Sequence, residues 1–318
     1  MSVTASAESG VPGGAGLLTP EQFSDFLETN FKKANARELA TPAQGQQFFN
    51  VQNTSLDHEK HTYVTGFRLV PKSRDGSDMP LGEVVQGFDN TYTPEDYRMG
   101  YGFESRLRET GQYRLITKIQ RGMQKAGKMT VEYLMVDPFN RGFGTSTAPW
   151  ICADGMYLFD SGRPLEDGSS TYSNLESAAA LSMNSLEDAK VNGRKMVNER
   201  GFRSPVNYTK LIVPPDLERK ALELCGSTLD PETGLNTTNV YQNKFKVVVW
   251  YLLTDTNAWF LAGDSSDPDY ELYWYWRLKP GIDTYKGANN PDVTYQRVKF
   301  SCVSGCDRPT LLRGNAGS

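Results

Sequence analysis

The sequence predicts an α+β protein, and three observations within residues 154–261 support this class. Apolar residues recur at helical spacing over 185–200, a short β-branched run at 210–213 ends in a double proline, and two further apolar runs follow at 246–253 and 258–262. Helical and strand-like patterns therefore alternate within one compact unit. Nothing in this unit has the residue pattern of an active site.

The first predicted helix spans residues 185–200. Ser185 is expected to be its N-cap, Asp188 follows three residues later, and Gly201 is expected to stop the helix. The spacing predicts an amphipathic helix with one buried face. That face carries the apolar or small residues Leu186, Ala189, Gly193, Met196 and Val197.

A strand and a second helix are predicted next. Residues 210–213 favour a strand that ends at Pro214, and Pro215 can occupy the first turn of a helix. The helix is expected to close at Gly226. Its apolar face consists of Leu217, Ala221, Leu224 and Cys225.

The two later apolar runs complete this unit. Residues 246–253 are too continuously apolar for an exposed edge strand and too short to cross a membrane, so we expect a strand that is covered on both faces. Residues 258–262 are expected to pair with it. The predicted core of the unit consists of Leu211, Val213, Leu217, Val248, Leu252, Trp259 and Phe260.

In this order the motifs resemble those of the major capsid proteins of tailed bacteriophages. No single motif is diagnostic, but their order is, and the pattern extends from Val131 to the C-terminus. Arg163 stands where many relatives have a histidine, and we assign no chemistry to it. The motifs are DGMYLF at 154–159, SNL at 173–175, LIVPPDL at 211–217, VVVWYLL at 247–253 and AWFL at 258–261.

The resemblance implies a fold: the tailed-phage major capsid protein fold, with an N-terminal arm, an extended β-hairpin loop, a long backbone helix with a peripheral sheet, and a central (axial) α+β domain. It implies a structural protein that assembles into hexamers and pentamers of an icosahedral head around double-stranded DNA. The implied divisions are the arm at 1–62, the hairpin loop at 63–104, the peripheral domain with the backbone helix at 105–153, the axial domain at 154–265, and C-terminal strands at 266–318 that return to both domains.

Composition limits the alternatives. The chain has 318 residues, enough for one large or two medium domains. Hydrophobic residues make up 38% and the mean hydropathy is -0.53, which is low for a compact globule and typical of extended polar segments that are buried only by neighbours. A net charge of -4 argues against a general nucleic-acid binder, although a shell around DNA need not be basic.

The cysteines and histidines predict no disulfide framework, metal site or cofactor. Four cysteines are scattered through a chain without a signal peptide, so reduced thiols are expected. Cys302 and Cys306 form a CxxxC motif, but His58 and His61 are the only histidines, and a four-ligand site would need distant partners. No apolar run is long enough for a transmembrane helix, so synthesis is expected in the host bacterial cytoplasm, without membrane association.

The N-terminal segment is expected to work as an arm. Residues 1–16 are small, polar and rich in glycine, and alone they would be disordered. A capping box at 19–22 predicts a helix with one apolar stripe. This helix packs either on its own domain or on a neighbouring subunit. The candidate intersubunit residues on the stripe are Phe23, Phe26 and Phe31.

Residues 63–104 predict a long β-hairpin. The alternation over 67–70, the turn residues Asp75-Gly76 and the returning run 83–88 support this. The resemblance implies that its tip, residues 72–79, reaches across the adjacent subunit. Some relatives crosslink this loop through a lysine, but a lysine at a turn is usually only solvated. The candidate contact residues at the tip are Lys72, Arg74, Asp75 and Asp78.

The resemblance places the backbone helix between residues 104 and 137. Its glycines at 111, 122 and 127 each cost about 1 kcal/mol relative to alanine. Either they break the helix or they allow close packing. Asp137-Pro138 is expected to end it, and the many charges indicate a solvated face rather than a DNA site. One helical face carries Leu107, Leu115, Ile119, Met123 and Ala126.

The last third is predicted to be a loop and two strands. The resemblance places the polar loop at 225–243 near the capsomer axis. Residues 270–277 and 293–302 predict antiparallel strands. The density of aromatic residues could serve base or sugar stacking, but core packing explains it more simply.

Two other functions are considered. An enzyme is disfavoured because the sequence has no G-x-S-x-G, H-E-x-x-H or P-loop motif. The shell of a bacterial nanocompartment shares the capsid fold and would enclose cargo protein instead of DNA. For the phage head, the expected location is the virion, and the expected partners are further copies of this chain, a portal, a separate scaffolding protein, a decoration protein and packaged DNA bound without sequence specificity.

Overall fold

The computed structural model describes residues 43–72, 78–82, 84, 86–104, 113–145, 148–165, 171–198, 200–233, 237–286 and 292–318. All of them belong to one compact unit, Pro42–Ser318. The predicted arm helix with Phe23, Phe26 and Phe31, and the predicted loop-tip residues Arg74 and Asp75, lie outside the described residues.

The larger of two four-stranded sheets has the order β1-β10-β11-β4. β10 and β11 are antiparallel, which confirms the predicted pairing, and β1 is parallel to β10. Aromatic side chains such as Trp274 and Trp276 lie in the core, so packing accounts for them. The strands are β1 (Asn50–Asn53), β4 (Glu95–Glu104), β10 (Leu272–Lys286) and β11 (Val293–Cys306).

The predicted hairpin over 63–104 is wrong in its pairing. The ribbon consists of β2 (Glu59–Val64) and β3 (Gln86–Tyr92), and residues 67–70 form no strand. Residues 95–104 are β4, which pairs with β11. The reason is Pro94, whose nitrogen has no hydrogen to continue the ladder, so the chain leaves the ribbon there and enters the larger sheet.

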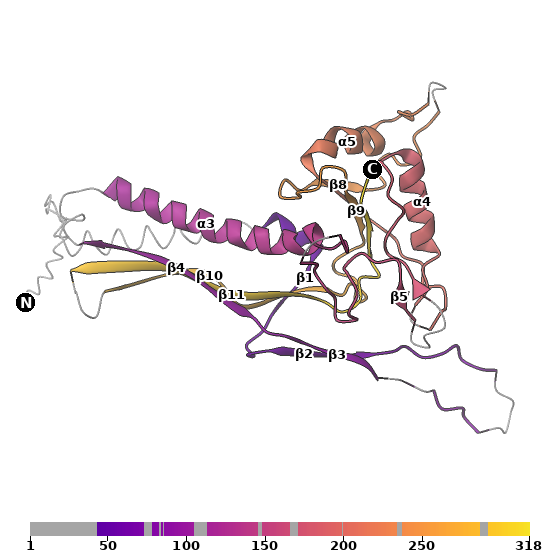
Figure 1. Cartoon of the computed structure of the whole chain (residues 1–318), viewed down its shortest axis with the longest axis horizontal. Helices are drawn as coiled ribbons and strands as arrows, with labels where there is room; N and C mark the ends of the chain where they lie inside the picture. The colour runs from indigo at the N-terminus through magenta and orange to yellow at the C-terminus, as the bar shows by residue number, and fades with distance from the viewer. Residues whose placement is uncertain are drawn as a thin grey trace, which may run out of the picture. The chain divides into compact units, whose positions relative to one another are not determined.

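Helix α3 (Tyr113–Asn140) runs along one face of the larger sheet (Figure 1). It is continuous over this span. A Cβ added at Gly127 would lie 3.2 Å from Cγ2 of Val298, so this glycine allows close packing on β11, whereas Gly122 has open space. The helix passes Pro138 in its last turn, so the predicted stop at 137–138 is slightly early.

The second sheet has the order β12-β9-β7-β8. β8 lies at its edge and pairs only with β7, in parallel, while β9 pairs with β7 and β12. The predicted pairing of 246–253 with 258–262, and the prediction that 246–253 is not an edge strand, are therefore wrong. Both faces of β8 are nevertheless packed, because Val248 is buried and Val247 and Val249 are half-buried against the core. The strands are β7 (Lys210–Val213), as predicted, β8 (Lys246–Val249), β9 (Trp259–Ala262) and β12 (Leu312–Asn315).

Trp250 explains why β8 is short. Its fully buried ring lies 5.0 Å from Phe48 and 5.3 Å from Phe139 between ring centroids. The chain turns after β8 to insert this ring, so Leu252 falls in a turn and is only half-buried. Asn140 holds the turn by donating to the Leu252 carbonyl at 3.1 Å.

Helix α4 (Met183–Arg194) begins and ends earlier than predicted. Ser182 is the N-cap, and its hydroxyl accepts the Ser185 amide at 3.1 Å. The Ser182 amide in turn donates to the Ser185 hydroxyl at 2.9 Å, so Ser185 is the third residue of a capping box and not the cap itself. The helix ends at Arg194, before Gly201.

The remaining elements are short. The double proline leads into the 3₁₀ turn η2 (Pro215–Leu217) and helix α5 (Glu218–Gly226), as predicted. A second 3₁₀ turn, η1 (Gln44–Phe48), precedes β1. Strands β5 (Arg163–Pro164) and β6 (Thr171–Tyr172) form a small antiparallel pair.

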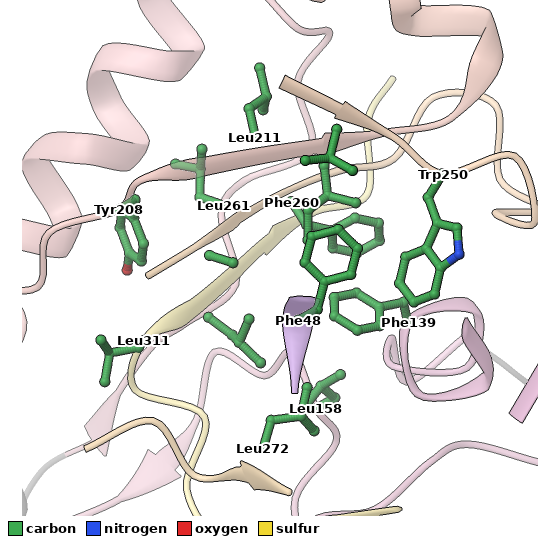
Figure 2. Packing of buried hydrophobic residues seen from close by; sticks show 14 of the residues in the cluster. Phe48, Phe139, Leu158, Tyr208, Leu211, Trp250, Phe260, Leu261, Leu272 and Leu311 are labelled. Atoms are coloured by element: carbon green, nitrogen blue, oxygen red, sulfur yellow. The ribbon is translucent and has the colours of Figure 1, made fainter. Parts of the chain in front are cut away.

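The core lies where α3, η1 and the second sheet meet (Figure 2). Phe48, Phe139 and Phe260 pack there, so residues assigned to the arm contribute to the body of the protein. Of the predicted core residues, five are buried and two, Leu217 and Leu252, are half-buried. The buried five are Leu211, Val213, Val248, Trp259 and Phe260.

Arg163 organises the motif at residues 154–159. Its side chain is fully buried, pairs with Asp154 and donates to the carbonyl oxygens of Tyr157 and Leu158. Asn174 accepts a further bond from it at 3.3 Å. One side chain therefore connects the DGMYLF and SNL motifs, and its role is structural.

Candidate assembly surface

The described residues of the connection between β2 and β3, which are 65–72, 78–82 and 84, expose a series of large apolar side chains. Val70 is 93% exposed and Leu81 is 87% exposed. Exposed apolar groups gathered on one segment are typical of a surface that contacts a partner. We call the five most exposed of these side chains the loop cluster: Phe67, Leu69, Val70, Met79 and Leu81.

The predicted contact residues Lys72 and Asp78 lie on the same segment and are exposed. The loop cluster was missed because the alternation over 67–70 predicts a strand of the hairpin. Pro71 and Pro80 carry the signal against that interpretation, since proline interrupts a strand ladder. Figure 1 shows the described residues on either side of the loop tip extending beyond the β2–β3 ribbon.

Stacked and charged side chains fix the base of the ribbon. The rings of Tyr63 on β2 and Phe88 on β3 stack with centroids 5.0 Å apart. Arg308 donates to the Tyr63 hydroxyl at 3.1 Å and to the Tyr172 hydroxyl at 2.7 Å. One guanidinium therefore joins the ribbon to the pair formed by β5 and β6.

A second connection runs through His61. Its Nδ1 lies 2.6 Å from Oδ2 of Asp307, and its Nε2 lies 2.7 Å from the hydroxyl of Tyr275. Tyr92 donates to the other oxygen of Asp307. The hydrogen bond to Asp307 raises the pKa of His61, partial burial opposes this rise, and the charge of Glu59 adds to it.

The start of the loop is held by the region after α4. Arg200 donates to the Gly66 carbonyl at 2.9 Å and to the Thr65 hydroxyl at 3.0 Å. A cavity of about 550 Å³ lies beside these contacts, with Val197, Asp267 and Leu311 among its lining residues. The base of the ribbon is thus fixed at several points, while the loop cluster is exposed.

The described residues offer little for chemistry. They contain no group of three or more histidine, cysteine, aspartate or glutamate side chains placed to hold a metal ion. All four cysteines are free and buried, and burial raises the pKa of Cys225 to about 11 and that of Cys302 to about 12. In the same part of the chain, no helix has the length and apolar character to cross a bilayer.

The body of the protein therefore combines two four-stranded sheets with the long helix α3, and its loop cluster is exposed. A family model described as phage capsid protein matches residues 90–309. The chain therefore belongs to the phage capsid protein family. No curated protein matches the sequence.

Solved structures agree on the fold. The procapsid of bacteriophage JBD30 has a TM-score of 0.52 at 16% identity, with 93% of this chain and 75% of that chain covered. The capsid of Myoviridae phage XM1 has a TM-score of 0.52 at 11% identity, with 89% of this chain and 98% of that chain covered. A structure from Mycobacterium phage Patience has a TM-score of 0.52 at 11% identity, with 98% of this chain and 94% of that chain covered.

These findings confirm the predicted capsid fold. The protein is a structural, non-enzymatic component of a virion shell, which forms by self-association.

Proposed function

We propose that this chain is the major capsid protein of a tailed phage and that its loop cluster joins neighbouring subunits into hexamers and pentamers of an icosahedral head. The observation that supports the proposal is the exposure of the loop cluster on a ribbon whose base is fixed to the body. In this role Lys72 and Asp78 set the register of the contact. Phe23, Phe26, Phe31, Arg74 and Asp75 have the same intersubunit role.

The energetics support a contact of this kind. Burying a Val, Leu, Phe or Met side chain is worth roughly 1.5–3 kcal/mol. The loop cluster supplies five such side chains. Closed symmetry repeats the contact at every subunit, so a modest gain per copy stabilises the whole shell.

The proposal includes the other components of a head. Double-stranded DNA fills the interior without sequence specificity, a portal and a separate scaffolding protein take part in assembly, and a decoration protein binds the finished shell. Synthesis takes place in the cytoplasm of the host bacterium. The division into arm, hairpin loop, peripheral domain, axial domain and C-terminal strands is part of the same proposal.

The test replaces three members of the loop cluster without changing charge. A triple variant, Leu69→Ser, Val70→Ser and Leu81→Ser, should keep its circular dichroism spectrum and yield few particles by sedimentation and negative-stain microscopy. The matched control replaces exposed apolar residues elsewhere, Leu56→Ser, Ile151→Ser and Val191→Ser. Normal particle yield from the triple variant would contradict the role of the loop.

The contents of native particles test the remainder of the proposal. Nuclease-treated particles should contain protected double-stranded DNA. Particles that contain cargo protein and no DNA would instead place the chain among nanocompartment shells.

A further inference from the structure

Four cations form a line on helix α3. Lys118, Arg121, Lys125 and Lys128 are separated by three, four and three residues, which places them on one face of the helix. The first three are exposed and Lys128 is half-buried. We call these four residues the α3 basic stripe.

Nothing acidic compensates this stripe. The sequence has no aspartate or glutamate between Tyr113 and Val131. Within the described parts of the chain, none of the four cations forms a salt bridge, although other surface cations do, such as Lys60 with Asp89. In a chain with a net charge of -4, this local excess of positive charge is unusual.

Packing fixes the direction in which the stripe points. The opposite side of α3 is buried, and Gly127 lies against Val298 of β11. Figure 1 shows α3 lying on one face of the sheet that contains β4, β10 and β11. Because the stripe is on the side of the helix that is not packed on the sheet, its charges point away from the sheet. The buried side carries Ile116, Gln120, Met123, Gln124 and Val131.

The composition of the stripe favours phosphate over protein as its partner. The cores of protein interfaces are depleted of lysine and enriched in aromatic residues. Over residues 116–128 the one large apolar side chain that is exposed is Ile119. Lysine binds phosphate as a mobile point charge and requires no fixed geometry.

The length of the stripe also fits a nucleic-acid backbone. Ten residues of α-helix separate Lys118 from Lys128, about 15 Å along the axis. Duplex DNA carries roughly nine phosphate charges over that length. Four cations without base-reading partners therefore suit binding that is independent of sequence.

We propose that the α3 basic stripe is the surface through which each subunit contacts the phosphate backbone of double-stranded DNA inside the shell. This inference rests on the proposed function and adds to it an orientation of the subunit: the α3 side of the larger sheet faces inward. The charged residues around α3 that looked like an ordinary solvated face in the sequence acquire a role because the fold aligns four of them.

The experiment measures DNA binding by the unassembled full-length subunit. Fluorescence anisotropy with a labelled duplex of random sequence, about 30 base pairs long, gives the association constant between 50 and 200 mM NaCl. The stripe variant is Lys118→Gln, Arg121→Gln, Lys125→Gln and Lys128→Gln. Glutamine resembles lysine and arginine in helix propensity, so α3 should be retained.

The expected result is a shallower salt dependence. Each lost phosphate contact reduces the slope of log K against log salt by about 0.9, so four contacts reduce it by up to about 3.6. Between 50 and 200 mM NaCl, the association constant of the wild type should therefore fall by about 10²-fold more than that of the stripe variant. An unchanged slope and affinity would overturn the proposal.

A control variant separates the stripe from overall charge. Arg194→Gln, Lys195→Gln, Arg219→Gln and Lys244→Gln remove the same charge from exposed positions elsewhere. This control should bind DNA as the wild type does. An equal loss in both variants would overturn the proposal, because net charge would then explain the binding.

Sedimentation without DNA distinguishes this inference from the proposed function. The stripe variant should form particles as readily as the wild type. A stripe variant that binds DNA normally and forms no particles would overturn the inference, because the stripe would then be a protein interface. Failure of the wild type itself to form particles would count against shell assembly, whatever the DNA measurement shows.

Discussion

The imidazole of His61 lies 2.6 Å from the carboxylate of Asp307, although 246 residues separate them in the chain. His61 belongs to β2, and Asp307 directly follows β11. This pair therefore connects the ribbon that carries the loop cluster to the larger sheet. Any change in its strength should affect how firmly the ribbon is held.

The first prediction concerns pH. The pKa of His61 is raised in the folded protein, so the pair contributes its full stability below the unfolded value of about 6.5 and loses it as pH rises through the folded value. The melting temperature of the unassembled subunit should therefore fall, in this window, by more in the wild type than in His61→Gln.

The comparison between the two proteins is necessary because other groups titrate as well. Glu59 and Asp307 act on the imidazole electrostatically, the Tyr275 hydroxyl bonds it, the Tyr273 ring packs on it, and Tyr92 bonds Asp307. All of these groups remain in both proteins. Identical pH profiles for the wild type and His61→Gln would show that the pair does not stabilise the ribbon.

The second prediction concerns the buried Arg163. Arg163→Ala leaves Asp154 without its partner and should lower the free energy of unfolding by about 3–5 kcal/mol. The matched control is Arg98→Ala, which breaks an exposed pair with Asp96 and should leave the free energy of unfolding nearly unchanged. Urea unfolding gives both values, and equal losses would contradict a structural role for Arg163.

The third prediction separates two residues that the sequence placed together in the core. Trp259→Ala should cost about 3–5 kcal/mol, because the ring is buried and its indole donates to the Ala179 carbonyl at 3.2 Å. Leu252→Ala should cost about 1 kcal/mol, since Leu252 is half-buried in a turn. Thermal unfolding distinguishes them, and a Trp259→Ala subunit that melts like the wild type would place β9 outside the core.

The fourth prediction separates folding from assembly. Replacing residues 72–79 with a short Gly-Ser turn removes Lys72, Asp78 and Met79, and leaves the contacts of His61 and Arg200 at the base of the ribbon. The variant should give a normal circular dichroism spectrum and form few particles by sedimentation. Loss of the fold would mean that the loop contributes to the subunit core, and normal particles would mean that its tip makes no essential contact.

Much of the second sheet and its helices could be predicted because the signals there are local. The β-branched run at β7 is terminated by Pro214-Pro215, and Pro215 starts the turn before α5. The order of motifs along the chain was sufficient to predict the capsid fold. The cap of α4 was misplaced by three residues because Ser182 and Ser185 are both good caps, and only their reciprocal bonds distinguish them.

The strand partners could not be predicted because pairing is a non-local choice. The residues of β4 do not show whether this strand pairs with β3 or with β11. The signal for β11 is Pro94, which lies just before β4 and interrupts the ladder with the ribbon. The loop cluster was missed for a related reason. The alternation over 67–70 does not reveal that these residues have no neighbouring strand to cover them.

The position of β12 has a consequence for the nascent chain. β9 is entirely buried between β7 and β12, yet β12 is made of residues 312–315, some fifty positions later in translation. Until those residues emerge from the ribosome, the apolar strand WFLA has an unpaired edge on which another chain could add. The second sheet is therefore completed only after residues 312–315 have been synthesised, about fifty residues after β9 itself.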